Sequence, residues 1–149
     1  MLDKVTVKTI SQLLDGFDIN HEIEDDSQIK FSLDATEEFP YELTIRIMVD
    51  EEWVKIYAVP DDFTISINDS TDYLLAVNHY NSWKVRIKGA LIIIKEIKMI
   101  TLKAENVYNF TGPISVEHLW QDCILFSLAG IRDFYNSIEK CKKEVLEDK

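Results

Sequence analysis

The chain has 149 residues, of which 46% are hydrophobic and 29% charged, proportions typical of one soluble globular domain spanning residues 1–149. Its formal net charge of −11 argues against nucleic acid and anionic membranes as partners, since both are bound mainly through Lys and Arg. The charge is uneven, because residues 1–80 carry 18 acidic and 5 basic side chains, whereas residues 81–149 carry 9 acidic and 11 basic ones.

A first helix is predicted over about residues 4–15. Thr6 is a suitable N-terminal cap, and apolar residues recur behind it at helical spacing. Gly16 stands where a residue in the left-handed conformation commonly ends a helix. The apolar positions are Val7, Ile10, Leu13 and Leu14.

From residue 19 onward the apolar pattern has a period of two, which is typical of strands because side chains two apart share one face of a sheet. Residues 28–33 alternate in this way, and residues 41–50 give the clearest strand signal in the chain. A polar turn at residues 50–52 predicts that residues 53–59 return as an antiparallel strand. Pro60 ends that strand, since proline has no N–H to donate.

Asp69, Ser70 and Thr71 offer caps for a second helix. Near its end, residues 78–83 hold an imidazole, a phenol, an indole, two amides and a hydroxyl, a mixture that suggests an active site. We interpret this stretch as the helix end, because Asn and Ser are favoured there. No carboxylate nearby in sequence would make His79 a general base, since Asp72 lies nearly two turns back.

The period of two resumes at residues 84–88, and residues 91–102 follow with mixed patterning. Ser115 then caps a long last helix, predicted to reach about residue 143. The order of helix, strands, helix, strands and helix predicts an α+β fold. It would be an antiparallel sheet with an N-terminal helix, a middle helix and a long C-terminal helix.

We predict no catalytic residue, no metal site and no cofactor, so the protein is not expected to be an enzyme. His21, His79 and His118 fall on three different elements, and neither cysteine has a second ligand at metal-binding spacing. Cys123 and Cys141 share one predicted helix about 27 Å apart, which excludes a disulfide between them and fits a reducing compartment. The first residues show no apolar region after a basic start, so no signal peptide is expected, and no apolar run approaches the ~20 residues of a membrane span. A cytoplasmic location is therefore expected.

A basic stretch lies between residues 84 and 103, which contain six Lys and Arg residues and a single acidic residue, Glu96. We predict that Lys84, Arg86 and Lys88 point to one face of a strand. The favoured interpretation is a solvated sheet face that pairs with acids on neighbouring strands. The functional alternative is a partner-binding face for an acidic peptide, with RNA as a lesser option.

The last helix is apolar on nearly every side between residues 123 and 131, and such a segment needs cover on more than one side. Other elements of the same chain could supply this cover. The alternative, which we favour, is a second copy of the chain in a two-fold homodimer. The predicted interface residues are Ile124, Leu125, Phe126, Leu128 and Ile131.

Four stretches carry a resemblance to a known family across nearly the whole chain. They are Val5-Thr6-x-x-x-Ile10-x-x-Leu13-Leu14, Val77-Asn78-x-x-Asn81, Gly112-x-Ile114-Ser115-x-Glu117-x-Leu119, and Phe134 with Ile138. In this layout the chain resembles the YbjN family of candidate bacterial sensory-transduction regulators, whose fold is similar to that of type III secretion chaperones.

The resemblance implies an α+β domain with helices on an antiparallel sheet, usually dimeric, without catalytic residues or cofactor. Residues 91–110 are longer than the hairpin it implies, so strand pairing there is left open. We expect a non-enzymatic protein-binding or chaperone-like regulatory protein that acts as a homodimer and binds a protein or peptide. The alternative is a regulator that senses a small molecule in an apolar pocket lined by Trp53, Tyr57, Tyr80 or Trp83.

Overall fold

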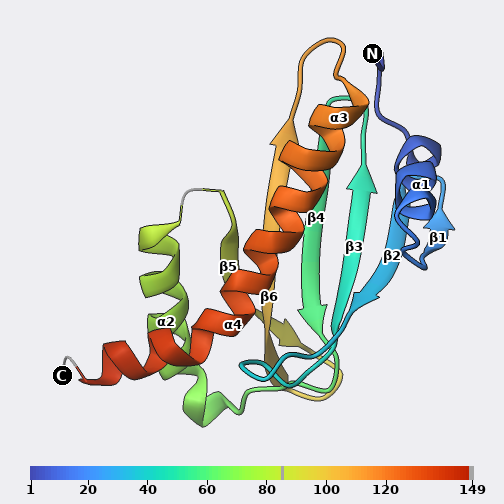
Figure 1. The fold of residues 1–149 in the computed structure, drawn as a ribbon. Coiled ribbons are helices and arrows are strands. Elements are labelled where there is room, and N and C mark those ends of the chain that lie inside the picture. The colour runs from blue at the N-terminus through green and yellow to red at the C-terminus, as the bar shows by residue number, and fades with distance from the viewer. Residues whose placement is uncertain (85, 148–149) are drawn as a thin grey trace.

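The computed structural model describes residues 1–84 and 86–147 and confirms the α+β fold (Figure 1). Six strands form one antiparallel sheet in the order β1-β2-β3-β4-β6-β5. The strands are β1 (Glu22–Asp25), β2 (Gln28–Leu33), β3 (Leu43–Val49), β4 (Trp53–Pro60), β5 (Lys88–Ile94) and β6 (Met99–Asn109). The helical elements are α1 (Val7–Gly16), η1 (Ile67–Asp69), α2 (Ser70–Trp83), α3 (Val116–His118), η2 (Leu119–Leu125) and α4 (Phe126–Glu147).

The period of two in the sequence becomes the two faces of the sheet. Ile45 and Ile47 of β3 and Ile56 of β4 are completely buried. Their neighbours Arg46 and Tyr57, which are paired across the two strands, point to the opposite face and stay partly exposed. The predicted strands at residues 28–33, 41–50 and 53–59 are therefore confirmed as β2, β3 and β4.

All the long helices cover the same face of the sheet. The buried side chains of α1, α2 and α4 join those of the strands in one hydrophobic core, and α4 crosses β4 and β6 diagonally (Figure 1). Tyr135 of α4 fixes this packing, because its hydroxyl donates to the carbonyl oxygens of Ala58 and Leu102, each at 2.9 Å. The helix is also close to β5, where a Cβ added at Gly89 would lie 2.2 Å from Phe134 Cε2.

The first helix begins later than predicted. Thr6 is its N-terminal cap as expected, with its Oγ1 accepting from Thr9 N–H at 3.2 Å, so the helix starts at Val7 rather than residue 4. The prediction that Gly16 adopts the left-handed conformation is wrong. The positive φ, 56°, falls instead on Asp18, a residue type that tolerates this conformation better than most.

The predicted strand at residues 84–88 is also wrong. Helix α2 continues to Trp83, Lys84 is its extended cap, and β5 begins only at Lys88. The alternation there has another cause, because Ile87 is buried and Arg86 exposed in a segment that forms no ladder. Val85, which belonged to that predicted strand, lies outside the described residues.

Residues 91–110, whose pairing the sequence left open, form most of a long hairpin. Strand β6 pairs with β5 on one side and with β4 on the other. The last helix is continuous from Val116 to Glu147, and Ser115 caps it by accepting from His118 N–H at 3.0 Å, as predicted. Its second segment, η2, is a π-helix, a form often found at functional sites. None of the helices within residues 1–84 and 86–147 has both the length and the apolar character needed to cross a bilayer.

Candidate functional site

The polar stretch at residues 78–83 lies in the last two turns of α2, which confirms that it is a helix end. Asn81 has a clear structural role there. Its carboxamide donates to the carbonyl oxygen of Gly89 at 3.0 Å and accepts from Gly89 N–H at 2.9 Å, so it ties the helix end to the start of β5. The exposed indole of Trp83 packs edge-on against the ring of His79.

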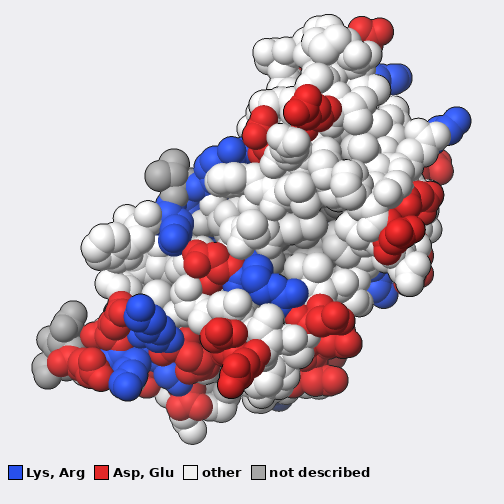
Figure 2. Space-filling model, viewed as in Figure 1, with Lys and Arg blue, Asp and Glu red and all other residues white. Residues whose placement is uncertain are grey.

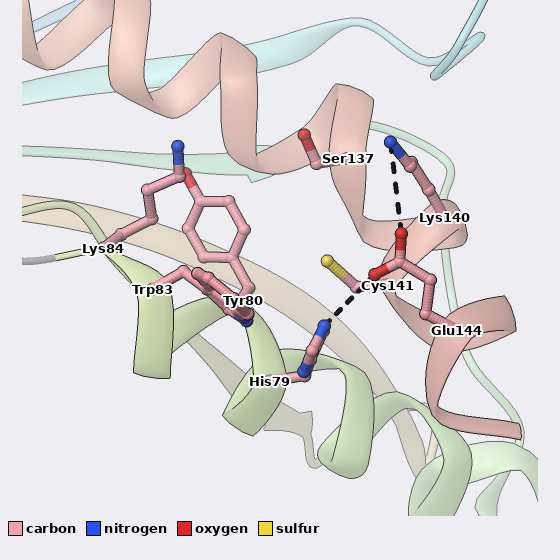
Figure 3. A pocket seen from close by; sticks show the side chains of 8 residues that line it. All are labelled: His79, Tyr80, Trp83, Lys84, Ser137, Lys140, Cys141 and Glu144. Carbon is pink, nitrogen blue, oxygen red and sulfur yellow. Dashed lines mark hydrogen bonds and ion pairs between the residues drawn. The ribbon is translucent and has the colours of Figure 1, made fainter. Parts of the chain in front are cut away.

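His79 nevertheless has a carboxylate partner that the sequence did not reveal. Its Nε2 lies 3.1 Å from Oε2 of Glu144, which comes from α4 sixty-five positions later. The pair lines a cleft of about 270 Å³ between α2 and α4 (Figure 3). The other lining residues are Tyr80, Trp83, Lys84, Ser137, Lys140 and Cys141.

An imidazole oriented by a carboxylate can activate a nucleophile that lies within hydrogen-bond reach, and the cleft contains two candidate nucleophiles, Cys141 and Ser137. Cys141 is buried, and desolvation, followed by the charges of Glu144 and Asp133, raises the pKa of its thiol, which disfavours the reactive thiolate. Ser137 donates to Asp133 rather than to the histidine. Among the described residues no hydrogen bond joins His79 to either nucleophile, so the cleft does not form a nucleophile–base pair.

A second cleft, of about 310 Å³, brings together residues that the sequence placed in two separate hypotheses. Lys84 and Arg86 from the basic stretch line it with Phe126 from the apolar segment. The guanidinium of Arg86 lies 4.3 Å from the centre of the Phe126 ring, a cation–π contact.

Asp133 closes one side of this cleft. It accepts from Tyr80 Oη at 2.9 Å and lies 3.2 Å from Lys84 Nζ. Burial, followed by the hydrogen bond to Asp133, raises the pKa of Tyr80 above its ordinary value, so its hydroxyl stays protonated and keeps donating. The carboxylate is therefore already satisfied within the chain, whereas Arg86 has no carboxylate partner within residues 1–84 and 86–147.

The predicted partner-binding face of Lys84, Arg86 and Lys88 needs correction in its geometry, since the first two precede the strand. Lys84 points to Asp133 and Arg86 to Phe126, while the ammonium of Lys88 donates to backbone carbonyls at the end of α2. The three cations surround the α2–β5 junction instead of forming one row on a strand.

The five predicted interface residues also divide. Ile124 and Ile131 are completely buried in the core of their own chain, and Leu128 is partly buried. Leu125 and Phe126 are 42% and 44% exposed. Figure 2 shows the helix-covered side of the molecule, where uncharged side chains dominate around η2 and the first half of α4. The exposed remainder of the predicted interface is therefore Leu125 and Phe126, with Leu128 beside them.

A hydrogen-bonded chain that sequence reasoning missed lies close to these residues. His118 at the start of the last helix bonds through Nδ1 to Asp122 at 2.5 Å and through Nε2 to the hydroxyl of Tyr108 on β6. Arg86 contacts the Tyr108 ring at 5.5 Å from its centre. The spacing of His118 and Asp122 was a local signal that the sequence offered. Tyr108 precedes the Gly112–Pro113 turn and His118 follows it, so no helical or strand spacing in the sequence relates the two residues.

The face of the sheet opposite the helices, which we call the open face, carries large side chains. Tyr57 lies near its middle, with Lys103 Nζ 4.9 Å and Lys55 Nζ 5.6 Å from its ring centre. Both lysines contact Glu105 Oε2, at 3.1 and 3.2 Å. None of its apolar side chains packs against the hydrophobic core. The open face comprises Arg46, Met48, Trp53, Lys55, Tyr57, Val59, Lys103, Glu105 and Val107.

Burial by itself would raise the pKa of Glu105, but the close positive charges of Lys103 and Lys55 outweigh it and hold that pKa below its ordinary value. The three charges thus form a compact network around an aromatic ring. Trp53 and Tyr57 on this face are separated by the sheet from Tyr80 and Trp83 on α2. The four aromatic residues considered for an apolar pocket therefore do not line one cavity. Within residues 1–84 and 86–147 no cluster of three or more potential metal ligands is found.

Comparison with known proteins places the fold. No protein-family model matches the sequence, and no curated protein matches it significantly. Among solved structures, the chain is similar to the crystal structure of YbjN from E. coli, described there as a candidate transcription regulator, with a TM-score of 0.67. The match covers 99% of this chain and 97% of that one at 9% sequence identity. The chain therefore has a YbjN-like fold, as its sequence motifs predicted.

Proposed function

We propose that the protein is a non-enzymatic, chaperone-like regulatory protein that binds another protein on the open face of its sheet and acts as a homodimer. The observation that supports it most is the composition of the open face. An antiparallel sheet with helices on one side commonly has polar residues on the other, solvated side. Here that side presents Trp53, Tyr57 and Met48, residue types that are enriched in protein interfaces.

The charges of the open face favour a protein partner further. Glu105 offsets one of the two positive charges of Lys55 and Lys103 around Tyr57, so the face combines an aromatic centre with a polar surround. Such an arrangement is typical of interface hot spots, in which an aromatic side chain is ringed by residues that exclude water.

The homodimer rests on the exposed apolar residues of the last helix. Leu125 and Phe126 are more than a third exposed, and Phe17, itself 56% exposed, stacks on Trp120 of the same helix at 4.2 Å between ring centres. Exposed apolar residues gathered on one helix favour self-association, which in soluble proteins is most often two-fold.

The partner-binding proposal is tested by capture from an extract of the native host cells. Wild-type protein should retain a stoichiometric protein partner, and Trp53→Ala combined with Tyr57→Ala should lose it. Leu74→Ala is the matched control, because Leu74 is a 48% exposed apolar residue on α2, away from the open face. Equal retention by the double variant and the wild type would contradict the proposal.

The dimer is tested by light scattering at micromolar concentration. Leu125→Asp should give a folded monomer, because this side chain is exposed in the single chain and the charge becomes costly only when a second subunit covers it. Ile124→Asp, at a buried position one residue earlier, should instead prevent folding. A wild-type protein of monomer mass would contradict the dimer.

The alternative of a small-molecule sensor receives less support from the geometry. Tyr80 and Trp83 line the cleft between α2 and α4, which also contains four ionisable side chains besides the tyrosine and the cysteine and is open at the surface. Native mass spectrometry that showed a retained small ligand would favour this alternative over protein binding.

A further inference from the structure

The two edges of the sheet are protected very differently. At one edge, β1 has four residues, three of them acidic, and its register with β2 is irregular between Ile23 and Asp25. Charge, shortness and irregularity all discourage pairing with another strand. At the other edge, β5 has seven residues and is wholly apolar from Ala90 to Ile94.

The backbone bonds of Asn81 show which groups of β5 point outward. Since its carboxamide binds both the N–H and the C=O of Gly89, these two groups point away from β6. Backbone groups alternate in direction along a strand of an antiparallel pair. The N–H and C=O groups of Leu91 and Ile93 must therefore point outward as well.

Strand β6 gives an independent check on this direction. Ile100, the partner of Ile93, exchanges both of its backbone bonds with Ile65 on the far side of β6, at 2.6 and 3.1 Å. Ile100 therefore has no backbone group left for Ile93. Within residues 1–84 and 86–147, no hydrogen-bond partner is found for the outward groups of Leu91 and Ile93.

The Asn81 carboxamide thus blocks strand pairing at the Gly89 end of the β5 edge. It occupies the place of a neighbouring strand at Gly89 and leaves the edge open only beyond it. The side chains there are also uncovered, because Ile93 is 73% exposed and Ile97 in the following turn is 56% exposed. A short open edge beside exposed apolar side chains is the arrangement that proteins use to add a strand from another chain.

We infer that the edge of β5 from Leu91 to Ile94 binds an extended apolar segment of another protein, flanked by acidic residues. The positive charges around the edge favour acidic residues on either side of the bound segment. Lys88 precedes the open part, and Lys95 and Lys98 follow it, with Glu96 as the one acid among residues 88–98. The rest of the chain is strongly acidic, so this local excess of lysine stands out.

A second copy of the chain fits this edge poorly. Two β5 strands side by side would bring the lysines of both copies together, and like charges across a strand pair are destabilising. The edge is also a different surface from the open face, so the inference stands apart from the proposed function. A negative result for peptide binding at the β5 edge would therefore not contradict partner binding on the open face, and the reverse also holds.

The experiment is an NMR titration of the full chain with a synthetic peptide of alternating valine and threonine that has two aspartates at each end. The largest amide shift changes should occur at Leu91 and Ile93. The same peptide with lysines in place of the aspartates should bind about tenfold more weakly or worse, because it meets like charge. Lys95→Glu should weaken binding of the acidic peptide about tenfold, whereas Lys140→Glu, at an exposed position on α4, should leave binding unchanged.

Ile93→Pro separates strand addition from simple charge attraction. Proline removes the outward N–H at this position but no hydrogen bond to β6, so the variant should fold and lose binding. If it fails to fold, the charge variants still decide the question. Absence of shift changes at Leu91 and Ile93 at millimolar peptide, or changes confined to Trp53 and Tyr57, would overturn the inference.

Discussion

The two faces of the sheet are built from alternate residues of the same strands, yet one is buried under the helices and the other is partly exposed. On the covered face Ile47, Ile56 and Ala58 are completely buried beneath the helices. On the open face Tyr57 lies among lysines and Glu105 and remains partly exposed. The covered face therefore supplies the hydrophobic core, whereas the side chains of the open face are not needed for that packing. Stability and binding should therefore respond to different residues.

The largest expected effect distinguishes neighbouring residues on β4. Ile56→Ala should lower the free energy of unfolding by about 2–5 kcal/mol, because it leaves a cavity in the core. Tyr57→Ala, one residue later on the open face, should cost about 1 kcal/mol or less. Urea denaturation measures both, and equal losses for the two variants would contradict the division between a packed face and an open face.

An intermediate effect is expected where the helix meets the covered side. A Cβ added at Gly130 of α4 would lie 2.2 Å from Ile87 Cγ1, so Gly130→Ala should destabilise the protein by about 1–3 kcal/mol. Gly16→Ala is the matched control, because nothing lies within 4 Å of its added Cβ, and it should stabilise α1 by about 0.5–1 kcal/mol. Ile87→Ala is itself destabilising because Ile87 is buried, but Gly130→Ala should cost less in an Ile87→Ala background than in the wild type. If thermal denaturation gave Gly130→Ala and the wild type the same melting temperature, the contact between Gly130 and Ile87 would not be tightly packed.

The alternation of strands β2, β3 and β4 could be predicted from sequence because one of their faces is buried and the other is not. The same rule failed at residues 84–88, where Ile87 is buried without belonging to a ladder. Periodicity reports burial, and burial does not require strand pairing. The start of β5 at Lys88 could therefore not be placed from the pattern alone.

The contacts of the candidate sites could not be predicted, because they join residues far apart in sequence. Glu144 reaches His79 only through the packing of α4 against α2, and Asn81 meets Gly89 only after the chain turns at the helix end. The apolar segment at residues 123–131 contains both buried residues, Ile124 and Ile131, and exposed ones, Leu125 and Phe126. Which of its residues remain exposed depends on how η2 lies on the sheet, which no local pattern encodes.

The smallest expected effect concerns the pH dependence of the open face. The pKa of Glu105 lies below its ordinary value of 4.5, so its ionised form stabilises the fold at neutral pH. That contribution is present above the ordinary pKa and is lost as the pH falls through the lowered one. The wild type should therefore lose more stability than Glu105→Gln between about pH 5 and pH 3. Parallel acid-denaturation curves for the two proteins would show that the lysine contacts contribute nothing.

The most direct test of the open face as a binding surface is photo-crosslinking in the native host cells. A benzophenone amino acid is placed at position 57 on the open face, or at position 74 on α2 as the control. We predict a discrete adduct with another protein from position 57 and none from position 74. No adduct from position 57, or the same adducts from both positions, would contradict the account.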